Sequence, residues 1–291
     1  MALVTIREML CDAREKHYAV PAFDVSSYKM ARSVLDVAEE LRAPVILMGL
    51  RGDLTEEQFD HLSVDLHSLA LSASIPVCTH LDHATDMNLI KKAIHQGYSS
   101  VMFDGSSLPF AENAEKTKAV VDYAHAYGVT VEAELGHVGD GIVGQAEAIA
   151  HGNAGHESKL TNADEMKKFI DETQVDCLAV SIGTSHGVYK CTPHLEMELL
   201  SRLNAVSTVP LVMHGGSGTP DDQMKEAIAR GISKVNIFSE IVNAYYTAMR
   251  DFLAAQTNLS LWTMTAEQAA NDALKEKVRE KFLLLGTDGK A

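Results

Sequence analysis

The sequence predicts a single α/β domain over residues 1–291, a (β/α)8 TIM barrel with an N-terminal capping helix and a C-terminal helical extension. Three observations support this. Apolar strand-like runs alternate with amphipathic helical patterns, eight such units follow one another, and the chain has an ordinary length for one barrel. An open, doubly wound parallel sheet is the competing arrangement, but eight repeated units favour closure.

The expected strands are short, nearly unbroken apolar runs, which is typical of parallel strands buried on both faces. A helix over Ile6–His17 precedes them, and helical spacing such as that of Tyr28–Arg42 fills most of the intervals. A last helical stretch, Ala266–Leu285, follows the eighth unit. The strands are expected at Ala19–Val25, Val45–Met48, Val77–Leu81, Ser100–Phe103, Thr130–Leu135, Cys177–Ile182, Leu211–His214 and Lys234–Phe238.

One connection departs from this regular pattern. His137–Asn162 follows the fifth expected strand, is rich in glycine and has little apolar periodicity. Connections of this length inside a compact domain are usually functional loops. We therefore expect it to act as a lid that becomes ordered when substrate binds.

Composition excludes several classes of partner. The net charge of −15 argues against nucleic acid and an anionic membrane surface, but it allows a small phosphorylated substrate. No segment approaches the ~20 apolar residues of a membrane helix, and charges in Met1–Lys16 exclude a signal-peptide core. The four cysteines form no CxxC pair, so we expect a cytoplasmic protein with reduced thiols.

Polar residues gather where the expected strands end. In this fold, catalytic groups lie at the carboxyl ends of the strands, and seven carboxylates and imidazoles on one rim are hard to explain as solvated side chains. Asn236 and Ser239 lie in and just after the eighth strand. The seven rim residues are Asp24, Asp82, His83, Asp104, Glu134, His186 and His214.

Histidines from three strand ends, His83, His186 and His214, predict a catalytic zinc ion with a fourth coordination position open for substrate. Asp82 directly precedes His83, and a turn at the strand end would bring both side chains to the barrel mouth. A carboxylate beside a metal-polarised hydroxyl is well placed for proton transfer.

A phosphate site is predicted beside the histidines. Gly215-Gly216-Ser217-Gly218 follows the seventh strand, and Asn236–Ser239 closes the eighth. Loops after these two strands often bind phosphate through backbone N–H groups in this fold. The expected ligand is therefore a small phosphorylated molecule.

Six segments, in this order, resemble the class II ketose-bisphosphate aldolases, which include the fructose- and tagatose-bisphosphate aldolases. The resemblance extends from Val4 to Lys290 and implies a zinc-dependent carbon–carbon lyase. Such an enzyme reversibly cleaves a ketose phosphate or bisphosphate to dihydroxyacetone phosphate and an aldehyde. We expect a homodimer or homotetramer. The segments are Thr79–His83, Ser100–Ser106, Val131–Gly136, Ile182–Gly187, Val212–Ser217 and Lys234–Asn236.

The resemblance assigns roles to individual residues. It implies that His83, His186 and His214 bind the zinc and that Asp82 exchanges a proton with the substrate C4 hydroxyl. Asp104 and Glu134 match positions that hold a second metal ion, or the first ion when displaced. The residues matching contacts to dihydroxyacetone phosphate are Gly187, Gly215, Gly216, Ser217, Asn236, Ile237, Phe238 and Ser239.

The sequence departs from the family pattern on the acceptor side. Asp24 stands where asparagine is usual, Leu50-Arg51 replaces a small hydroxyl residue, and Asn271 stands where an arginine helps to hold the distal phosphate. With Asp24 and Arg51 contacting the acceptor, we favour a ketose 1-phosphate whose aldehyde half lacks phosphate. A fructose- or tagatose-1,6-bisphosphate aldolase, with Arg51 holding the second phosphate, is the alternative.

The usual glutamate-bearing loop is also replaced. Gly139-Asp140-Gly141 and a longer insert stand in its place, so we expect the lid to exchange the C1 proton of dihydroxyacetone phosphate. The candidate groups are Asp140, Glu147 and Glu157.

Three other functions fit the sequence less well. A Schiff-base aldolase needs a lysine inside the barrel, whereas Lys234 is expected at the far end of the eighth strand and Lys190 in a loop. A zinc hydrolase lacks the H-x-H pair expected at the end of the first strand. A non-catalytic sugar-phosphate-binding protein would not need the complete set of aspartates and histidines.

Overall fold

The computed structural model describes residues 2–50, 52, 54–140, 159–187, 189 and 192–291. Within these ranges, eight parallel strands close into a barrel in the order β1-β10-β9-β7-β5-β4-β3-β2, which confirms the predicted fold. The barrel strands are β1 (Val20–Asp24), β2 (Val45–Leu50), β3 (Val77–Ala84), β4 (Ser100–Phe103), β5 (Thr130–Leu135), β7 (Cys177–Val180), β9 (Leu211–Met213) and β10 (Ile232–Ile237).

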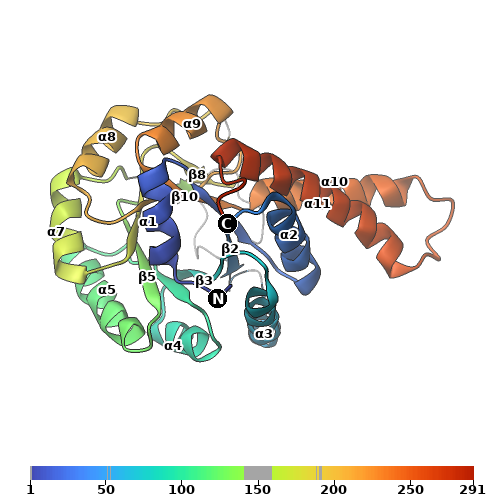
Figure 1. Ribbon diagram of the computed structural model, residues 1–291, viewed down its shortest axis with the longest axis horizontal. Coiled ribbons are helices and arrows are strands. Elements are labelled where there is room, and N and C mark those ends of the chain that lie inside the picture. The colour runs from blue at the N-terminus through green and yellow to red at the C-terminus, as the bar shows by residue number, and fades with distance from the viewer. Residues whose placement is uncertain (1, 51, 53, 141–158, 188, 190–191) are drawn as a thin grey trace.

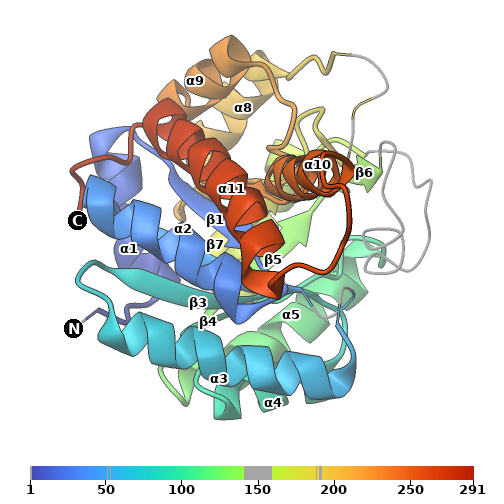
Figure 2. The same cartoon turned by 90° about the vertical axis from the view of Figure 1, so that its right-hand side faces the viewer.

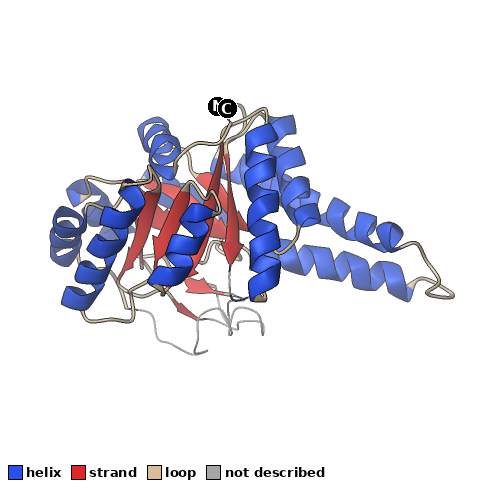
Figure 3. Ribbon diagram, turned by 90° about the horizontal axis from the view of Figure 1, so that it is seen from below, coloured by secondary structure: helices blue, strands red, loops and turns tan. Residues whose placement is uncertain are grey.

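Helices surround the barrel (Figures 1 and 3). None of those in the described part of the chain has the length and apolar character that a membrane span requires. The helices are α1 (Ile6–Lys16), α2 (Tyr28–Leu41), α3 (Glu56–Ser72), α4 (Met87–His95), α5 (Phe110–His125), α7 (Ala163–Thr173), α8 (Met197–Val206), α9 (Asp221–Ala229), α10 (Ser239–Ala254) and α11 (Thr263–Leu285).

Helix α1 caps the barrel, as the sequence predicts. Thr5 and Glu8 form a reciprocal capping box at its start, and His17 ends it in the left-handed region. Its buried face, which includes Met9 and Leu10, packs against residues of the barrel interior. The opposite, carboxyl end of the strands is therefore the end available for a site.

Two very short strands, which the sequence pattern did not reveal, lie beside the barrel. β6 (Gly139–Asp140) and β8 (Ser185–His186) pair in parallel, with Asp140 opposite His186. A two-residue strand leaves no detectable periodicity. Residues 141–158, most of the predicted lid, lie outside the described residues.

Helices α10 and α11 form the C-terminal extension. Their distant ends reach beyond the barrel (Figures 1 and 3), and Figure 2 views the extension from that side. The second half of α11 packs on its own barrel, where the Phe282 and Phe23 ring centroids are 5.7 Å apart. Lys275 donates to Asp36 of α2 at 2.6 Å. The helix is thereby held both by apolar burial and by an ion pair.

Candidate active site

A local distortion of β3 brings adjacent residues to the barrel mouth. His83 has a φ of 45°, in the left-handed region, and the pairing of β3 with β4 shifts register between Leu81 and Ala84. On a regular strand, the side chains of Asp82 and His83 would point to opposite faces. This turn lets both line one cavity, which agrees with the prediction that a strand-end turn would bring them together.

Three histidines meet at this point. Ring centroids of His83 lie 5.0 Å from His186 and 4.7 Å from His214, and those of His186 and His214 are 5.8 Å apart. One ring nitrogen from each histidine lies within 4.8 Å of the others, which is close enough for a single metal ion. The structure therefore brings together the three residues that the sequence singled out.

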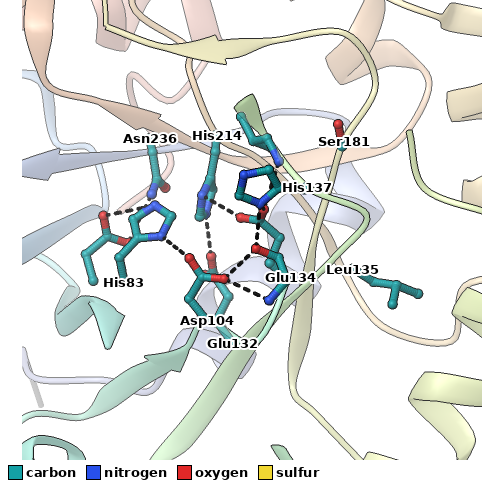
Figure 4. A network of polar contacts seen from close by, with 12 residues as sticks. His83, Asp104, Glu132, Glu134, Leu135, His137, Ser181, His214 and Asn236 are labelled. Carbon is teal, nitrogen blue, oxygen red and sulfur yellow. Dashed lines mark hydrogen bonds and ion pairs between the residues drawn. The ribbon is translucent and has the colours of Figure 1, made fainter. Parts of the chain in front are cut away.

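His83 is oriented by an acidic partner. Its Nδ1 lies 2.8 Å from Asp104 Oδ2, so its Nε2 faces away from that carboxylate (Figure 4). Asp104 Oδ1 in turn accepts from the Ser106 backbone N–H at 3.0 Å and from its hydroxyl at 2.7 Å. The Ser106 hydroxyl also lies 2.9 Å from His137 Nδ1. Such outer hydrogen bonds fix the direction in which a ligand presents its free nitrogen.

Glu134 provides a second possible metal group together with His83 and Asp104. Its Oε1 accepts from the Val138 N–H at 2.9 Å, and its buried Oε2 lies 3.4 Å from His214 Nδ1. The two candidate groups share His83, so the rim offers two neighbouring positions for a metal ion. This arrangement is compatible with the roles that the resemblance assigns to Asp104 and Glu134.

Asp82 is buried beside the histidines. Its Oδ1 accepts from Asn236 Nδ2 at 3.2 Å, and its Oδ2 lies 3.8 Å from His83 Nε2. Burial alone raises the pKa of Asp82, but neighbouring positive charge, first that of His83, outweighs burial and holds this pKa below its usual value. Asp82 is therefore ionised at neutral pH and able to accept a proton.

The site has an excess of carboxyl groups. Burial lowers the pKa of His83, but the charges of Asp82 and Asp104 outweigh it and raise that pKa to about 10. Burial raises the pKa of Glu134 to about 8, and the charge of Asp104 acts in the same direction. A buried cluster that takes up protons in this way favours a bound cation.

One buried nitrogen atom is suited to bind such a cation directly. His214 is fully buried, and its Nδ1 has no hydrogen-bond partner in the described part of the chain. Burial also lowers the pKa of His214, so its ring is neutral, as a metal ligand must be. The donor set thus fits a metal ion.

Paired loops hold His186 and the glycine-rich turn against each other. β6 fixes the β8 strand that carries His186. Tyr189 then links the two loops, because its hydroxyl donates to Gly215 O at 2.7 Å and accepts from the Ser185 N–H at 3.2 Å. Gly215 has a φ of 67°, and a Cβ there would lie 2.4 Å from Ser185 O, so glycine is required.

The glycine-rich turn leads to the start of α10. The Ser217 hydroxyl accepts from the Phe238 N–H at 3.2 Å and from the Glu240 N–H at 3.3 Å. These N–H groups belong to the helix N-terminus, where the partial positive charge favours anions. The Gly216 N–H donates to Asn236 O at 3.0 Å, so it holds the turn together.

A single cavity unites most of the predicted residues, and no lysine or arginine is among the described residues that line it. Four of the predicted residues that the structure describes are not part of the lining: Asp104, Glu134, His214 and Gly216. Arg51 lies outside the described residues. Asn271 packs between helices, with its Oδ1 accepting from Ser33 of α2 at 3.3 Å. The lining consists of Asp24, Leu50, Asp82, His83, His186, Gly187, Gly215, Ser217, Asn236, Ile237, Phe238 and Ser239.

The position expected for Lys234 is wrong. β10 begins at Ile232, so Lys234 is its third residue, and its side chain is fully buried inside the barrel. Its ammonium group lies 2.7 Å from Glu132 Oε2, and nearby negative charge raises the pKa of Lys234 despite burial. A Schiff-base nucleophile needs a neutral amine, so this paired lysine does not support that mechanism. Lys190 lies outside the described residues.

Glu132 is the residue that sequence reasoning missed. It is fully buried and contacts both Lys234 and His214. A signal was present, because Glu132 stands two residues before Glu134, and Lys234 stands two before Asn236. Residues with this spacing on a strand face the same side, so both could have been assigned to the barrel interior.

Comparisons with known proteins agree with this geometry. Residues 4–290 match the class-II fructose-bisphosphate aldolase family. The chain is 40% identical to the YdjI protein of Escherichia coli strain K12, over 99% of both chains. The crystal structure of the YdjI aldolase from that organism has a TM-score of 0.87, at 36% identity over 99% of both chains.

A putative fructose-1,6-bisphosphate aldolase from Coccidioides immitis has a TM-score of 0.86, at 28% identity over 98% of this chain and 97% of that one. The family match and the similarity to these aldolase structures identify the protein as a carbon–carbon lyase of the aldolase type. The chain belongs to the class II fructose-bisphosphate aldolase family.

Proposed function

We propose that this enzyme is a zinc-dependent aldolase that reversibly cleaves a ketose 1-phosphate to dihydroxyacetone phosphate and an unphosphorylated aldehyde. The convergence of His83, His186 and His214 beside buried Asp82 carries the proposal. Three imidazoles suit zinc, and two of them, His83 and His186, line the cavity. When bound, zinc supplies a Lewis acid that offsets the negative charge developing on the substrate's ketone oxygen.

Asp82 is proposed to move the C4 proton. In the cleavage direction its carboxylate takes the proton from the C4 hydroxyl, and in condensation it returns that proton. Asn236 supports this role, because its amide donates to Oδ1 at 3.2 Å and holds the carboxylate in one orientation. A positioned carboxylate that is ionised at neutral pH is suited to general base catalysis.

The phosphate of dihydroxyacetone phosphate is proposed to bind where the β9 and β10 loops meet. The Ser217 hydroxyl accepts from the Phe238 and Glu240 N–H groups at the start of α10, which holds the glycine-rich turn against this helix N-terminus. The partial positive charge of a helix N-terminus favours an anion, and this supports the proposal. The proposed contacts are Gly187, Gly215, Gly216, Ser217, Asn236, Ile237, Phe238 and Ser239. The C1 proton is assigned to an acidic lid residue, with Asp140, Glu147 and Glu157 as candidates.

The proposal that the aldehyde lacks a phosphate depends on the charged residues that line the cavity. Asp24 lines the cavity and is almost fully buried, and the described lining contains no lysine or arginine to pair with a second phosphate. A buried carboxylate repels phosphate but accepts hydrogen bonds from sugar hydroxyls. If Arg51 reaches the acceptor and binds a second phosphate, the enzyme is instead a fructose- or tagatose-1,6-bisphosphate aldolase.

The proposal is tested in the condensation direction. Zinc-loaded enzyme is incubated with dihydroxyacetone phosphate and a panel of phosphorylated and free aldehydes, and the ketose products are quantified. We expect products from free aldehydes, loss of activity with a chelator and recovery with added zinc. Activity that survives chelation but is trapped by borohydride would contradict the metal mechanism.

We also propose a homodimer or homotetramer. The stretch from Phe252 to Ala266 covers the end of α10, the connection and the start of α11, and it contains no charged residue in a chain with a net charge of −15. Trp262, in the connection between α10 and α11, is 86% exposed, and Leu259 in the same connection is also exposed. Such a surface fits a second copy of this chain. The double variant Leu259→Ser/Trp262→Ser should reduce the mass measured by light scattering, and an unchanged mass would contradict this interface.

The cellular location is proposed to be the cytoplasm. Cys11, Cys78 and Cys177, the cysteines that the structure describes, are all free thiols, which supports a reducing compartment.

A further inference from the structure

A buried ion pair lies inside the barrel beneath the histidines. Glu132 of β5 and Lys234 of β10 are both fully buried, with Nζ 2.7 Å from Oε2. Barrel interiors are usually filled by branched apolar side chains. Removing two charges from water is costly, so such a pair is weak evidence of a stabilising role by itself. Its contacts indicate a different role.

The second oxygen of this carboxylate reaches a proposed zinc ligand. Glu132 Oε1 lies 2.8 Å from His214 Nε2, while Oε2 is occupied by Lys234 (Figure 4 shows Glu132 and His214). An ionised carboxylate only accepts hydrogen bonds, so His214 Nε2 carries the proton. The proton-free nitrogen is then Nδ1, the one included in the candidate metal group.

A neighbouring histidine restricts how Glu132 can move. His80 Nε2 lies 3.8 Å from Glu132 Oε2, and its Nδ1 lies 2.8 Å from the Ser100 hydroxyl. Cys177 donates to the same oxygen at 3.6 Å. Oε2 is thereby held by several groups on one side, which leaves Oε1 directed at the His214 ring.

The contrast with Asp104 shows what is particular to Glu132. Asp104 orients His83, but it also belongs to the second candidate metal group and can become a ligand itself. Glu132 belongs to neither group found among the described residues. Its interaction with a possible metal ion is therefore made only through His214.

We infer that Glu132 and Lys234 are positioning residues that fix the tautomer and ring orientation of His214, so that Nδ1 faces the metal ion. The inference rests on the proposed zinc-dependent function. Glu132 accepts the Nε2 proton, and Lys234 compensates its charge and holds its second oxygen. A carboxylate–histidine pair of this kind also makes the free ring nitrogen a better ligand, and its loss weakens metal binding about 10–100-fold.

Two double variants separate the effect of the hydrogen bond between His214 and residue 132 from the effects of the buried charges and of folding. Glu132→Met/Lys234→Met removes both charges and the acceptor, whereas Glu132→Gln/Lys234→Met removes the charges but retains a carbonyl oxygen that can accept from His214. The zinc dissociation constant is measured by competition with a chromogenic chelator, and the melting temperature is measured for metal-free protein. Replacing both members of a buried ion pair by side chains of similar size is often tolerated.

We expect the methionine pair to bind zinc about 10–100-fold more weakly than wild type, with the glutamine variant closer to wild type. Ile46→Val is the matched control, because Ile46 is a buried apolar residue of the same interior cluster. It should lower the melting temperature slightly and leave zinc affinity unchanged. Equal zinc affinity in the two double variants would overturn the inference.

A second measurement needs neither variant to fold. In metal-free wild-type protein, long-range ¹H–¹⁵N spectra report which ring nitrogen carries the proton, and His214→Gln identifies the signals. We expect the Nε2–H tautomer of His214, and the Nδ1–H tautomer would overturn the inference. Wild-type protein that has this tautomer but binds no zinc would contradict the proposed function instead.

Discussion

Replacing Asp82 by asparagine tests the proton transfer while disturbing little else. The side chain keeps its size, and its amide oxygen can still accept from Asn236 Nδ2, which now lies 3.2 Å from Oδ1. Asp82 belongs to neither candidate metal group in the described part of the chain, so Asp82→Asn should retain zinc. We therefore expect Asp82→Asn to remove only the general base that accepts the C4 proton.

The expected fall in the cleavage rate can be given because only the general base is removed. A positioned general base contributes roughly 10²–10⁴-fold to the rate, which corresponds to about 3–5 kcal/mol of transition-state stabilisation. We expect a fall of this size in kcat for cleavage, measured by coupling dihydroxyacetone phosphate formation to its enzymatic reduction. Zinc content is measured on the same samples by atomic absorption.

A partial reaction provides the control. Exchange of the C1 proton of dihydroxyacetone phosphate with solvent does not involve the C4 hydroxyl, so Asp82→Asn should retain it. A loss of cleavage below tenfold, with zinc still bound, would remove Asp82 from the proposed role. Equal loss of cleavage and exchange would indicate that the substitution disturbs the whole site.

Four further predictions concern the metal, the lid, the acceptor and the fold. Purified protein should contain about one zinc ion per chain, and metal and activity should be lost together in His83→Ala, His186→Ala and His214→Ala; full activity without metal would contradict the site. Release of tritium from labelled dihydroxyacetone phosphate should fall in at least one lid variant, and normal release in all three would place the C1 base elsewhere; the variants are Asp140→Asn, Glu147→Gln and Glu157→Gln. The ratio of kcat/KM should favour glyceraldehyde over glyceraldehyde 3-phosphate; a hundredfold preference for the phosphorylated aldehyde that collapses in Arg51→Ala would instead identify a bisphosphate aldolase. Phe282→Ala should lower the free energy of unfolding in urea by about 3–5 kcal/mol, because it empties a fully buried contact with Phe23, and a change below 1 kcal/mol would show that α11 contributes little to the barrel.

Much of the barrel could be predicted because its signals are local. Parallel strands buried on both faces appear as unbroken apolar runs, and the expected run Ser100–Phe103 coincides with β4. The rim residues could be predicted for a related reason, because the fold brings all carboxyl strand ends to one mouth.

The tertiary structure alone decided which side chains meet inside the barrel, beneath the rim. Glu132 is 82 residues from His214 and 102 from Lys234, so no local pattern could show that one carboxylate contacts both. The sequence by itself determined the strand order along the chain and the residue types at each strand end. Closure of the barrel decided the interior contacts, because it sets distant strands opposite each other and leaves every buried charge in need of a partner.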